Sequence, residues 1–311
     1  MAGPAGAGFA QTRRALRWFS VACVLVLAAC ASPNVPVPPA VPPLAPVPVV
    51  KPAPRIGLAL GGGAARGFAH VGVIQVLEEA GIRPDLVVGT SAGSVVAAIY
   101  ASGRSGAQLQ QIAESMEEAS LADWTLPLFG RSLLRGEAIA RYVNAQVGGR
   151  PIESMGMKLG IVATDLHSGE GILFRRGDTG IAVRASSAVP SLFQPVRIAG
   201  NEYVDGGLVA PVPVRYARQM GAELVIAVDI SNAPQNNAPD GVLQVLLQTF
   251  TIMGKSINAL ELRDADVVVQ PGLVGVGSAD FSARRRAIEA GRAAMLAALP
   301  AYKAKLASMM Q

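Results

Sequence analysis

Cysteine is scarce in this sequence, with two among 311 residues. Cys23 lies inside an N-terminal apolar stretch that we expect to be cleaved off, which leaves Cys30 as the one thiol of the mature chain. One thiol forms no intramolecular disulfide and builds no cysteine-based metal site. The shortage of cysteine therefore excludes both features from the mature protein.

Histidine is equally scarce, because His70 and His167 are the only two. In α/β-hydrolases the serine nucleophile is followed along the chain by an acid and then by a histidine. That order requires a histidine after the acid, but no histidine lies beyond residue 167, which precedes most of the candidate acids. The usual triad is thereby excluded. A serine nucleophile in this chain needs a carboxylate as its direct base, or the serine is not catalytic.

Aromatic residues make up only 5% of the chain. No basic stripe is interleaved with them, so we expect no nucleic-acid partner. The formal charge of +5 includes Arg13, Arg14 and Arg17, and no acid lies among residues 1–29, so loss of that segment lowers the charge to +2. The one tight basic cluster, residues 284–286, is typical of a solvated helix face.

Residues 1–29 have the pattern of a bacterial export signal. Arginines precede an apolar region, residues 19–29, which is short for a membrane span. The sequence Leu27-Ala28-Ala29-Cys30 resembles a lipobox, which implies cleavage before Cys30 and a diacylglycerol on its thiol. Ala31 follows Cys30. By resemblance to sorted lipoproteins, this predicts an outer-membrane location facing the periplasm.

Residues 30–54 form a linker, and ten of the 22 prolines fall in it. This composition favours an extended polyproline II conformation and cannot build a core. We expect the folded domain at residues 55–311, where apolar strand-like runs alternate with helical patterns. That alternation predicts an α/β fold in which helices cover both faces of a parallel sheet.

The expected strands are short apolar runs. They lie at 56–60, 86–88, 159–164, 171–175, 196–199, 202–204, 224–228 and 267–270. The expected helices follow the 3.6-residue period of apolar residues. They lie at 68–80, 94–102, 107–120, 137–147, 182–187, 242–262 and 284–299.

The stretch Gly89-Thr90-Ser91-Ala92-Gly93 fits the pattern G-x-S-x-G. It lies between an expected strand and an expected helix, so Ser91 would sit on a sharp turn with its hydroxyl above the sheet. Crowding at such a turn requires the small residues Gly89 and Gly93. The helix N-terminus behind Ser91 favours an oxyanion. The pattern predicts a nucleophile elbow, although a plain glycine-rich turn has the same residues.

A second glycine-rich turn, Gly61-Gly62-Gly63-Ala64-Ala65-Arg66-Gly67, joins the first expected strand to the first helix. Turns of this kind present backbone N–H groups to a phosphate or an oxyanion. A dinucleotide fingerprint needs another glycine spacing and an acid after the next strand, and a P-loop needs Gly-Lys-Ser or Gly-Lys-Thr. Neither pattern is present. Because adjacent parallel strands end at one crevice, we expect this turn and Ser91 to form one site.

Four aspartates follow expected strands and are candidate bases. They are Asp165, Asp205, Asp229 and Asp266. Asp205 is the favoured base because the glycines at 206 and 207 let the backbone bend sharply toward another loop. Asp165 and Asp229 are expected to cap strand ends. His70 is expected to be a packed or capping residue on the first helix rather than a base.

These two turns, with Ala185-Ser186-Ser187-Ala188-Val189-Pro190 and Asp205-Gly206-Gly207, resemble motifs of the patatin-like phospholipase family in the same order. The resemblance covers about residues 55–300. It implies a three-layer α/β/α sandwich with a mostly parallel central sheet.

The resemblance also implies roles for the site residues. Ser91 would be the nucleophile and Asp205 the base. The oxyanion hole would be formed by backbone N–H groups around Gly62, Gly63 and Arg66, and the 185–190 segment would support the site. The implied reaction is hydrolysis of acyl esters in phospholipids and lysophospholipids, with no metal and no organic cofactor.

The resulting hypothesis is a serine acyl hydrolase tethered to a membrane through Cys30. A non-catalytic lipid-binding or scaffolding lipoprotein with the same fold is an open alternative, and a nucleotide-binding enzyme is a third. Segment 124–129, with Trp124 and Phe129 between two expected helices, leaves two interpretations open. Its side chains pack into the core, or they form an apolar lip over the acyl pocket, because Trp and Phe suit a membrane interface.

Overall fold

The computed structural model describes residues 52–117, 123, 132–231, 241–277 and 279–311. The expected export signal, Cys30 and most of the linker lie outside the described residues, as do Trp124 and Phe129. Residues Val50–Gln311 form one compact unit, to which every feature below belongs. Among the described helices, none combines the length and apolar character that a membrane span requires.

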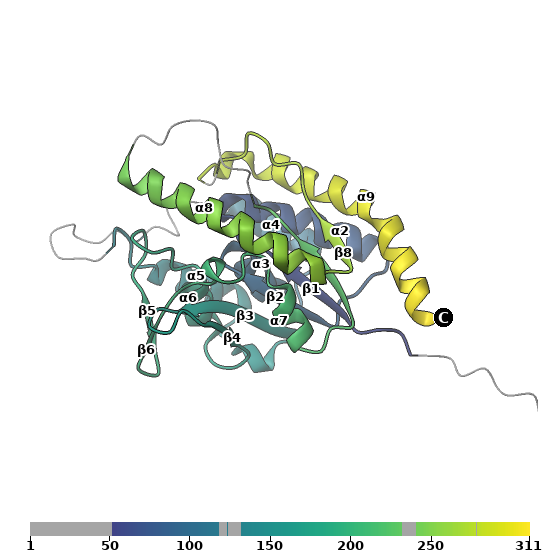
Figure 1. Cartoon of the computed structure of the whole chain (residues 1–311), viewed down its shortest axis with the longest axis horizontal. Coiled ribbons are helices and arrows are strands. Elements are labelled where there is room, and N and C mark those ends of the chain that lie inside the picture. The colour runs from purple at the N-terminus through teal and green to yellow at the C-terminus, as the bar shows by residue number, and fades with distance from the viewer. Residues whose placement is uncertain (1–51, 118–122, 124–131, 232–240, 278) are drawn as a thin grey trace, which may run out of the picture. The chain divides into compact units, whose positions relative to one another are not determined.

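An eight-stranded sheet runs through this unit (Figure 1). Its strands are β1 Ile56–Leu60, β2 Leu86–Thr90, β3 Lys158–Asp165, β4 Gly171–Phe174, β5 Val196–Ile198, β6 Asn201–Asp205, β7 Leu224–Val228 and β8 Val267–Val269. The order is β5-β6-β3-β2-β1-β7-β8, and β4 pairs with β3 outside that path. The pairs along β3-β2-β1-β7-β8 are parallel, whereas β4, β5 and β6 pair antiparallel.

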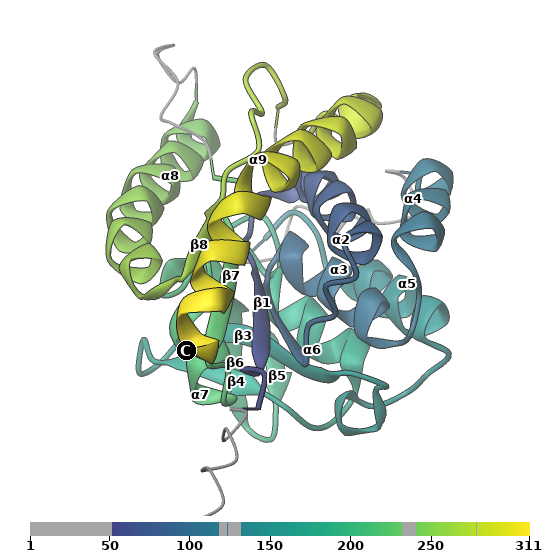
Figure 2. The same ribbon diagram turned by 90° about the vertical axis from the view of Figure 1, so that its right-hand side faces the viewer.

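Helices cover both faces of the sheet, as the end-on view of Figure 2 shows. They are α2 Ala69–Glu79, α3 Ala92–Ala101, α4 Gly106–Ser115, α5 Glu137–Val147, α6 Thr179–Ser186, α7 Val214–Gln219, α8 Val242–Glu261 and α9 Arg284–Met310. One layer contains α2 to α6 and α9, and the opposite layer contains α7 and α8. The expected α/β class and three-layer architecture are confirmed.

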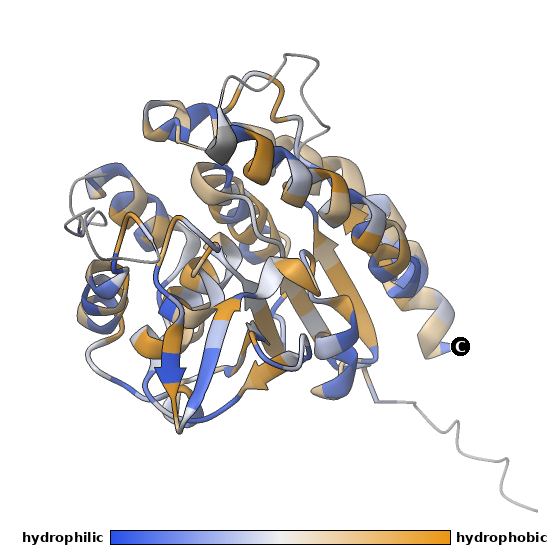
Figure 3. Cartoon of the chain, turned by 60° about the vertical axis from the view of Figure 1, so that its left-hand side comes forward, coloured by the Kyte–Doolittle hydropathy of each residue, from blue (hydrophilic) through white to orange (hydrophobic). Residues whose placement is uncertain are grey.

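The central strands are apolar throughout because both of their faces are covered. Leu58 and Leu60 of β1 belong to the larger core cluster, whereas Ala59 between them belongs to the cluster under α7. Side chains alternate across a strand, so a strand between two helical layers needs apolar residues at every position. In Figure 3 the hydrophobic colour accordingly runs along strands that lie between helices.

Most expected elements lie where the sequence placed them, and β1, β7 and α5 have the expected bounds. The main correction concerns α9. We expected it to end at residue 299. Pro300 follows, and a proline inside a helix removes a backbone hydrogen bond and crowds the preceding turn. The helix instead continues to Met310. Tyr302 beyond the proline is buried in the main core cluster, and we attribute the continuation to that packing.

Smaller differences arise where local pattern is weak. The sequence did not predict α7, which has only six residues and is defined by its buried Val214, Tyr216 and Ala217. Helix α6 begins at Thr179, three residues before the expected start, because the Asp178 side chain accepts a hydrogen bond from the Ile181 N–H and caps it. Helix α4 ends at Ser115 rather than at residue 120.

Candidate active site

Ser91 lies on a sharp turn between β2 and α3. Its backbone has φ 52° and ψ −124°, a conformation that L-residues rarely adopt. A Cβ at Gly89 would overlap the Gly93 carbonyl, and a Cβ at Gly93 would overlap the Leu60 carbonyl. The two glycines therefore allow the close approach that the turn requires. This local geometry is that of a nucleophile elbow.

The sheet brings Asp205 to this turn. In β3, Val162 pairs with Thr90 of β2 and also with strand β4. The next residue, Ala163, pairs with Asp205 of β6 and also with β4. Since β4 occupies one edge of β3, β2 and β6 share the other edge. They run in opposite directions along it, so their C-terminal ends meet at neighbouring positions.

Ser91 and Asp205 are in hydrogen-bonding contact at this junction. The Ser91 Oγ–H donates to Asp205 Oδ2 at 2.7 Å, and the Gly207 N–H donates to Asp205 Oδ1 at 2.7 Å. A Cβ at Gly206 would overlap the Val162 carbonyl oxygen. The glycine at 206 is therefore required for the chain to turn this tightly against β3 after the aspartate.

Burial determines the acidity of this carboxyl group. Asp205 is only 7% exposed, and burial raises its pKa to about 6, against the lowering effect of hydrogen bonds from Gly207 and Ser91. Loss of solvation disfavours the charged form of a carboxyl group. The carboxylate is still the main form at neutral pH, and its pKa lies close to the value that suits a general base there.

The glycine-rich turn lies beside Ser91, but two of its expected backbone N–H donors already have hydrogen-bond partners. The Gly62 N–H donates to the Pro211 carbonyl at 2.9 Å, and the Arg66 N–H donates to the Gly63 carbonyl at 3.2 Å. These two amides already have partners. In the described part of the chain, the amides of Gly63, Ala64 and Ala65 have none. Ala64 and Ala65 open a short 3-10 turn, Ala64–Phe68, and line the same cavity as Ser91.

Two buried side chains hold the turn in place. The Arg66 Nε–H donates to the Gly63 carbonyl at 3.1 Å, and burial lowers the pKa of this guanidinium, opposed by Asp229. His70 lies fully buried on α2, where its Nε2 is 2.8 Å from the Gly61 carbonyl oxygen. Burial lowers the pKa of His70 to about 4, so the neutral ring donates to Gly61. His70 is a packed residue, as expected.

The other candidate aspartates have structural contacts. Asp165 accepts hydrogen bonds from the His167 and Ser168 N–H groups, and Asp229 accepts one from the Ser231 N–H. Both cap the turns that follow their strands, as expected. Asp266 accepts from the Val225 N–H and pairs with Arg218.

The three arginines at residues 284–286, expected on a solvated helix face, also have hydrogen-bond or ion-pair partners. Arg284 donates to three carbonyls at the C-terminus of α4, Arg285 pairs with Glu114, and Arg286 donates to the Gly275 carbonyl. These contacts tie the start of α9 to its neighbours.

An apolar cavity of about 320 Å³ opens at Ser91. It lies among α3, α5 and the chain that follows α6. Its lining includes Val95, Val96, Ile139, Val143, Leu192 and Phe193, and no charged side chain occurs among its described lining residues. Hydroxyl groups come from Ser91, Tyr142 and Ser187. A cavity with this lining is suited to an alkyl chain and not to a charged group.

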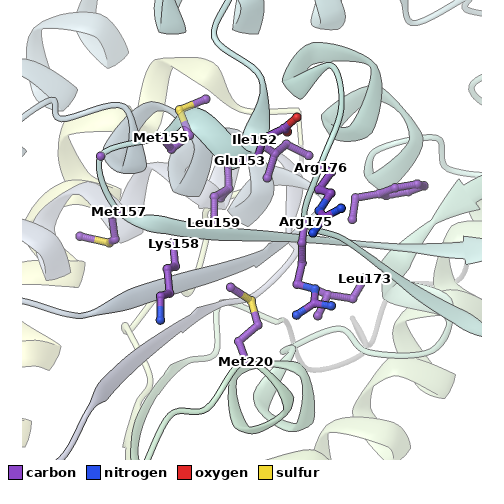
Figure 4. Close-up of a pocket in the computed structure, with 12 residues that line it drawn as sticks. Ile152, Glu153, Met155, Met157, Lys158, Leu159, Leu173, Arg175, Arg176 and Met220 are labelled. Carbon is purple, nitrogen blue, oxygen red and sulfur yellow. The ribbon is translucent and has the colours of Figure 1, made fainter.

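A larger hollow of about 680 Å³ lies away from this site (Figure 4). Met155, Met157, Lys158 and Met220 line it with other residues. Lys158 is the first residue of β3, whereas Ser91 and Asp205 lie near Val162 and Ala163, farther along that strand. This hollow contains none of the expected site residues.

Comparison with known proteins gives the same family along much of the chain. The profile described as patatin-like phospholipase matches residues 58–218, about half of the sequence. An uncharacterised NTE family protein of Mycobacterium tuberculosis is 35% identical over 208 residues, which cover 67% of this chain and 58% of that protein. Patatin-like phospholipase domain-containing protein 6 of Mus musculus is 34% identical over 190 residues, 58% of this chain and 14% of that protein.

The chain thus spans less than two thirds of the length of these relatives. Among solved structures, VipD from Legionella pneumophila aligns with a TM-score of 0.49 and 15% identity, covering 81% of this chain and 67% of that one. The family profile, and the relative that matches two thirds of the chain, identify this protein as a member of the patatin-like phospholipase family.

Proposed function

We propose that this protein is a serine acyl hydrolase that cleaves carboxylic esters of lipids through Ser91 and Asp205. The observation that carries the proposal is the 2.7 Å hydrogen bond from Ser91 Oγ to Asp205 Oδ2, made by a serine on a strained strand-to-helix turn. Family membership supports the same class of reaction, because the family is described as patatin-like phospholipase. No histidine is needed between the two residues, since the carboxylate contacts the hydroxyl directly.

The chemistry follows from this contact. Ser91 Oγ attacks the ester carbonyl carbon while its proton passes to Asp205 Oδ2. The carbon–oxygen bond to the alcohol breaks, the proton moves to the departing alkoxide, and the acyl group remains on Ser91. Water then attacks the acyl-enzyme, gives its proton to Asp205, and releases the fatty acid as Ser91 regains a proton.

Backbone amides of the glycine-rich turn would stabilise the tetrahedral oxyanion. Because the Gly62 and Arg66 amides have partners, we assign this role to the amides of Gly63, Ala64 and Ala65. Preorganised N–H donors aimed at developing negative charge are a large term in acyl transfer. The acyl chain would occupy the apolar cavity beside Ser91, and the head group, which has no charged partner there, would remain outside it.

The proposal includes a membrane location. Cys30 would carry the lipid anchor and residues 30–54 would tether the domain, so the enzyme would act on phospholipid or lysophospholipid from the periplasmic side of the outer membrane. Two or more acyl chains are sufficient for stable anchoring. This part of the proposal rests on the lipobox resemblance and on composition.

A fluorophosphonate probe that reacts covalently with activated serines tests the proposal against the non-catalytic alternative. We expect one adduct on the intact protein, mapped to Ser91, and none on Ser91→Ala. Ser94→Ala is the matched control, because Ser94 lies one turn away on α3 and its hydroxyl donates to the Ser91 carbonyl and not to Asp205. A folded wild-type protein that stays unlabelled would favour a scaffold or lipid-binding role.

A further inference from the structure

The end of α6 contacts both residues of the Ser91–Asp205 pair. The Ser186 Oγ accepts a hydrogen bond from the Ser91 N–H at 2.8 Å and donates one to the Val162 carbonyl at 2.6 Å. Two residues later, the Ala188 carbonyl accepts a hydrogen bond from the Asp205 N–H at 2.9 Å. One short stretch of chain therefore binds the backbone of the serine and the backbone of the aspartate.

The position of Val162 shows what the two hydrogen bonds of the Ser186 hydroxyl connect. Val162 pairs with Thr90, the residue before Ser91, and it precedes Ala163, which pairs with Asp205. Its carbonyl is thus at the point where the ends of β2 and β6 meet. By bonding to this carbonyl and to the Ser91 amide at once, the Ser186 hydroxyl links the nucleophile to the strand that positions the base.

The backbone conformation of Ser91 needs such a link. A residue at φ 52° and ψ −124° is in a sparsely populated region, and such conformations persist only where the surroundings determine them. The Ser91 amide has no helical partner, because it precedes α3. The Ser186 Oγ is its hydrogen-bond acceptor, and Ser186 is fully buried, so water cannot substitute for it.

We infer that Ser186 is a positioning residue, whose hydroxyl orients Ser91 so that its Oγ faces Asp205 Oδ2. It does not touch the ester. This inference rests on the proposed function of Ser91. Loss of the hydroxyl removes the acceptor of the Ser91 amide and its link to the Val162 carbonyl, so the Oγ would sample orientations away from Asp205. Misplacement of a reacting group by about 1 Å costs on the order of 100-fold in rate.

Ser102 provides a matched control. It is also buried, and its Oγ–H donates to the Ile99 carbonyl at 2.7 Å, at the end of α3 that is remote from Ser91. It is not among the residues that line the cavity at Ser91. Ser186→Ala and Ser102→Ala each remove a buried hydroxyl that donates to a backbone carbonyl, so a difference between them reports on the bond to the Ser91 amide.

The experiment compares steady-state hydrolysis of a soluble short-chain ester by wild type, Ser186→Ala, Ser186→Cys and Ser102→Ala, with melting curves for each. The concentration of folded protein normalises kcat. We expect Ser186→Ala to lose about 10- to 100-fold in kcat with KM changed by less than about threefold. Ser186→Cys fills the space with a poor hydrogen-bonding group, so we expect a similar loss. Ser102→Ala should stay within about threefold of wild type.

Each outcome either supports or overturns the positioning role of Ser186. Wild-type kcat in folded Ser186→Ala, or losses equal to those of Ser102→Ala, would overturn it. Full activity in Ser186→Cys would show that packing, not hydrogen bonding, is what Ser186 supplies, and would overturn it too. The acid limb of the pH profile should move to higher pH in Ser186→Ala, because a weakened hydrogen bond from Ser91 lowers the Asp205 pKa less. Absence of turnover in wild type is a separate result, which would refute the proposed function itself.

Discussion

Thr90 and Asp205 occupy consecutive positions along one edge of β3, opposite Val162 and Ala163. They belong to strands that run toward each other, and they are far apart in sequence. This register explains how a chain with no histidine after residue 167 can place a carboxylate against the serine that follows Thr90. The contact between Ser91 and Asp205 is a property of the sheet, and not of two flexible loops.

The first prediction concerns pH. Burial raises the pKa of Asp205 to about 6, and the base must be ionised to accept the serine proton. Activity should therefore fall as pH decreases, with kcat/KM for a soluble ester dropping about tenfold per pH unit below about pH 6. His70, with its pKa lowered to about 4, stays neutral over this range. A kcat/KM that is flat from about pH 5 to 7 would exclude Asp205 as the base.

The second prediction concerns stability. An acid whose pKa is higher in the folded chain binds more protons when folded, so its contribution to stability falls as pH rises from the ordinary value of 3.8 to about 6. Asp205→Asn removes the buried charge and should raise the free energy of unfolding at neutral pH by roughly 1–3 kcal/mol.

Urea unfolding at two pH values checks this prediction. The stabilisation by Asp205→Asn should be present near pH 7 and should shrink toward zero near pH 4, where the wild-type carboxyl group is mostly protonated. An Asn variant that is less stable than wild type at neutral pH would contradict the burial argument.

The third prediction concerns chain length. A cavity of 320 Å³ holds about ten methylenes if each occupies about the 30 Å³ of a liquid water molecule. For a series of p-nitrophenyl esters, kcat/KM should rise by up to about fourfold per methylene, from about 0.8 kcal/mol of burial each. It should level off near ten carbons.

Filling the cavity should shift this optimum. Val96→Phe places a larger side chain in the lining and should move the optimum toward shorter esters while sparing the acetate ester. The matched control is Val274→Phe, because Val274 is 95% exposed. Equal loss on every ester, acetate included, would mean that the cavity is not the acyl site.

The fourth prediction concerns the anchor. Cys30→Ser should leave the protein soluble or unprocessed, whereas Cys23→Ser, in the expected signal, should not change its location. Labelling with radioactive fatty acid, followed by membrane fractionation, measures both. If Cys30→Ser fractionated with the outer membrane like wild type, another part of the chain would have to provide the attachment.

Local sequence pattern was sufficient to predict the elbow at Ser91, because crowding at that turn restricts residues 89 and 93 to glycine. It also singled out Asp205, through the glycine pair that follows it. Those features are short-range. The partner of the Gly62 amide is Pro211, which is remote in sequence, so no local pattern shows that this amide is already engaged.

The role of Ser186 was also beyond local pattern. The sequence placed it in a segment that supports the site, but its bonds to Ser91 and Val162 depend on how α6 packs against β3 and α3. Likewise, Pro300 predicts a helix end, and only the burial of Tyr302 beyond it accounts for the continuation. Tertiary packing decides these points.

The most direct test of the account is hydrolysis of a soluble ester by Ser91→Ala, Asp205→Asn and the double variant, with folded protein confirmed in each. Because the two residues act as a unit, we expect each single variant to lose about 10²- to 10⁴-fold in kcat, and the double variant to be little worse than either. Turnover near the wild-type rate in folded Asp205→Asn would contradict the central claim that this carboxylate activates Ser91.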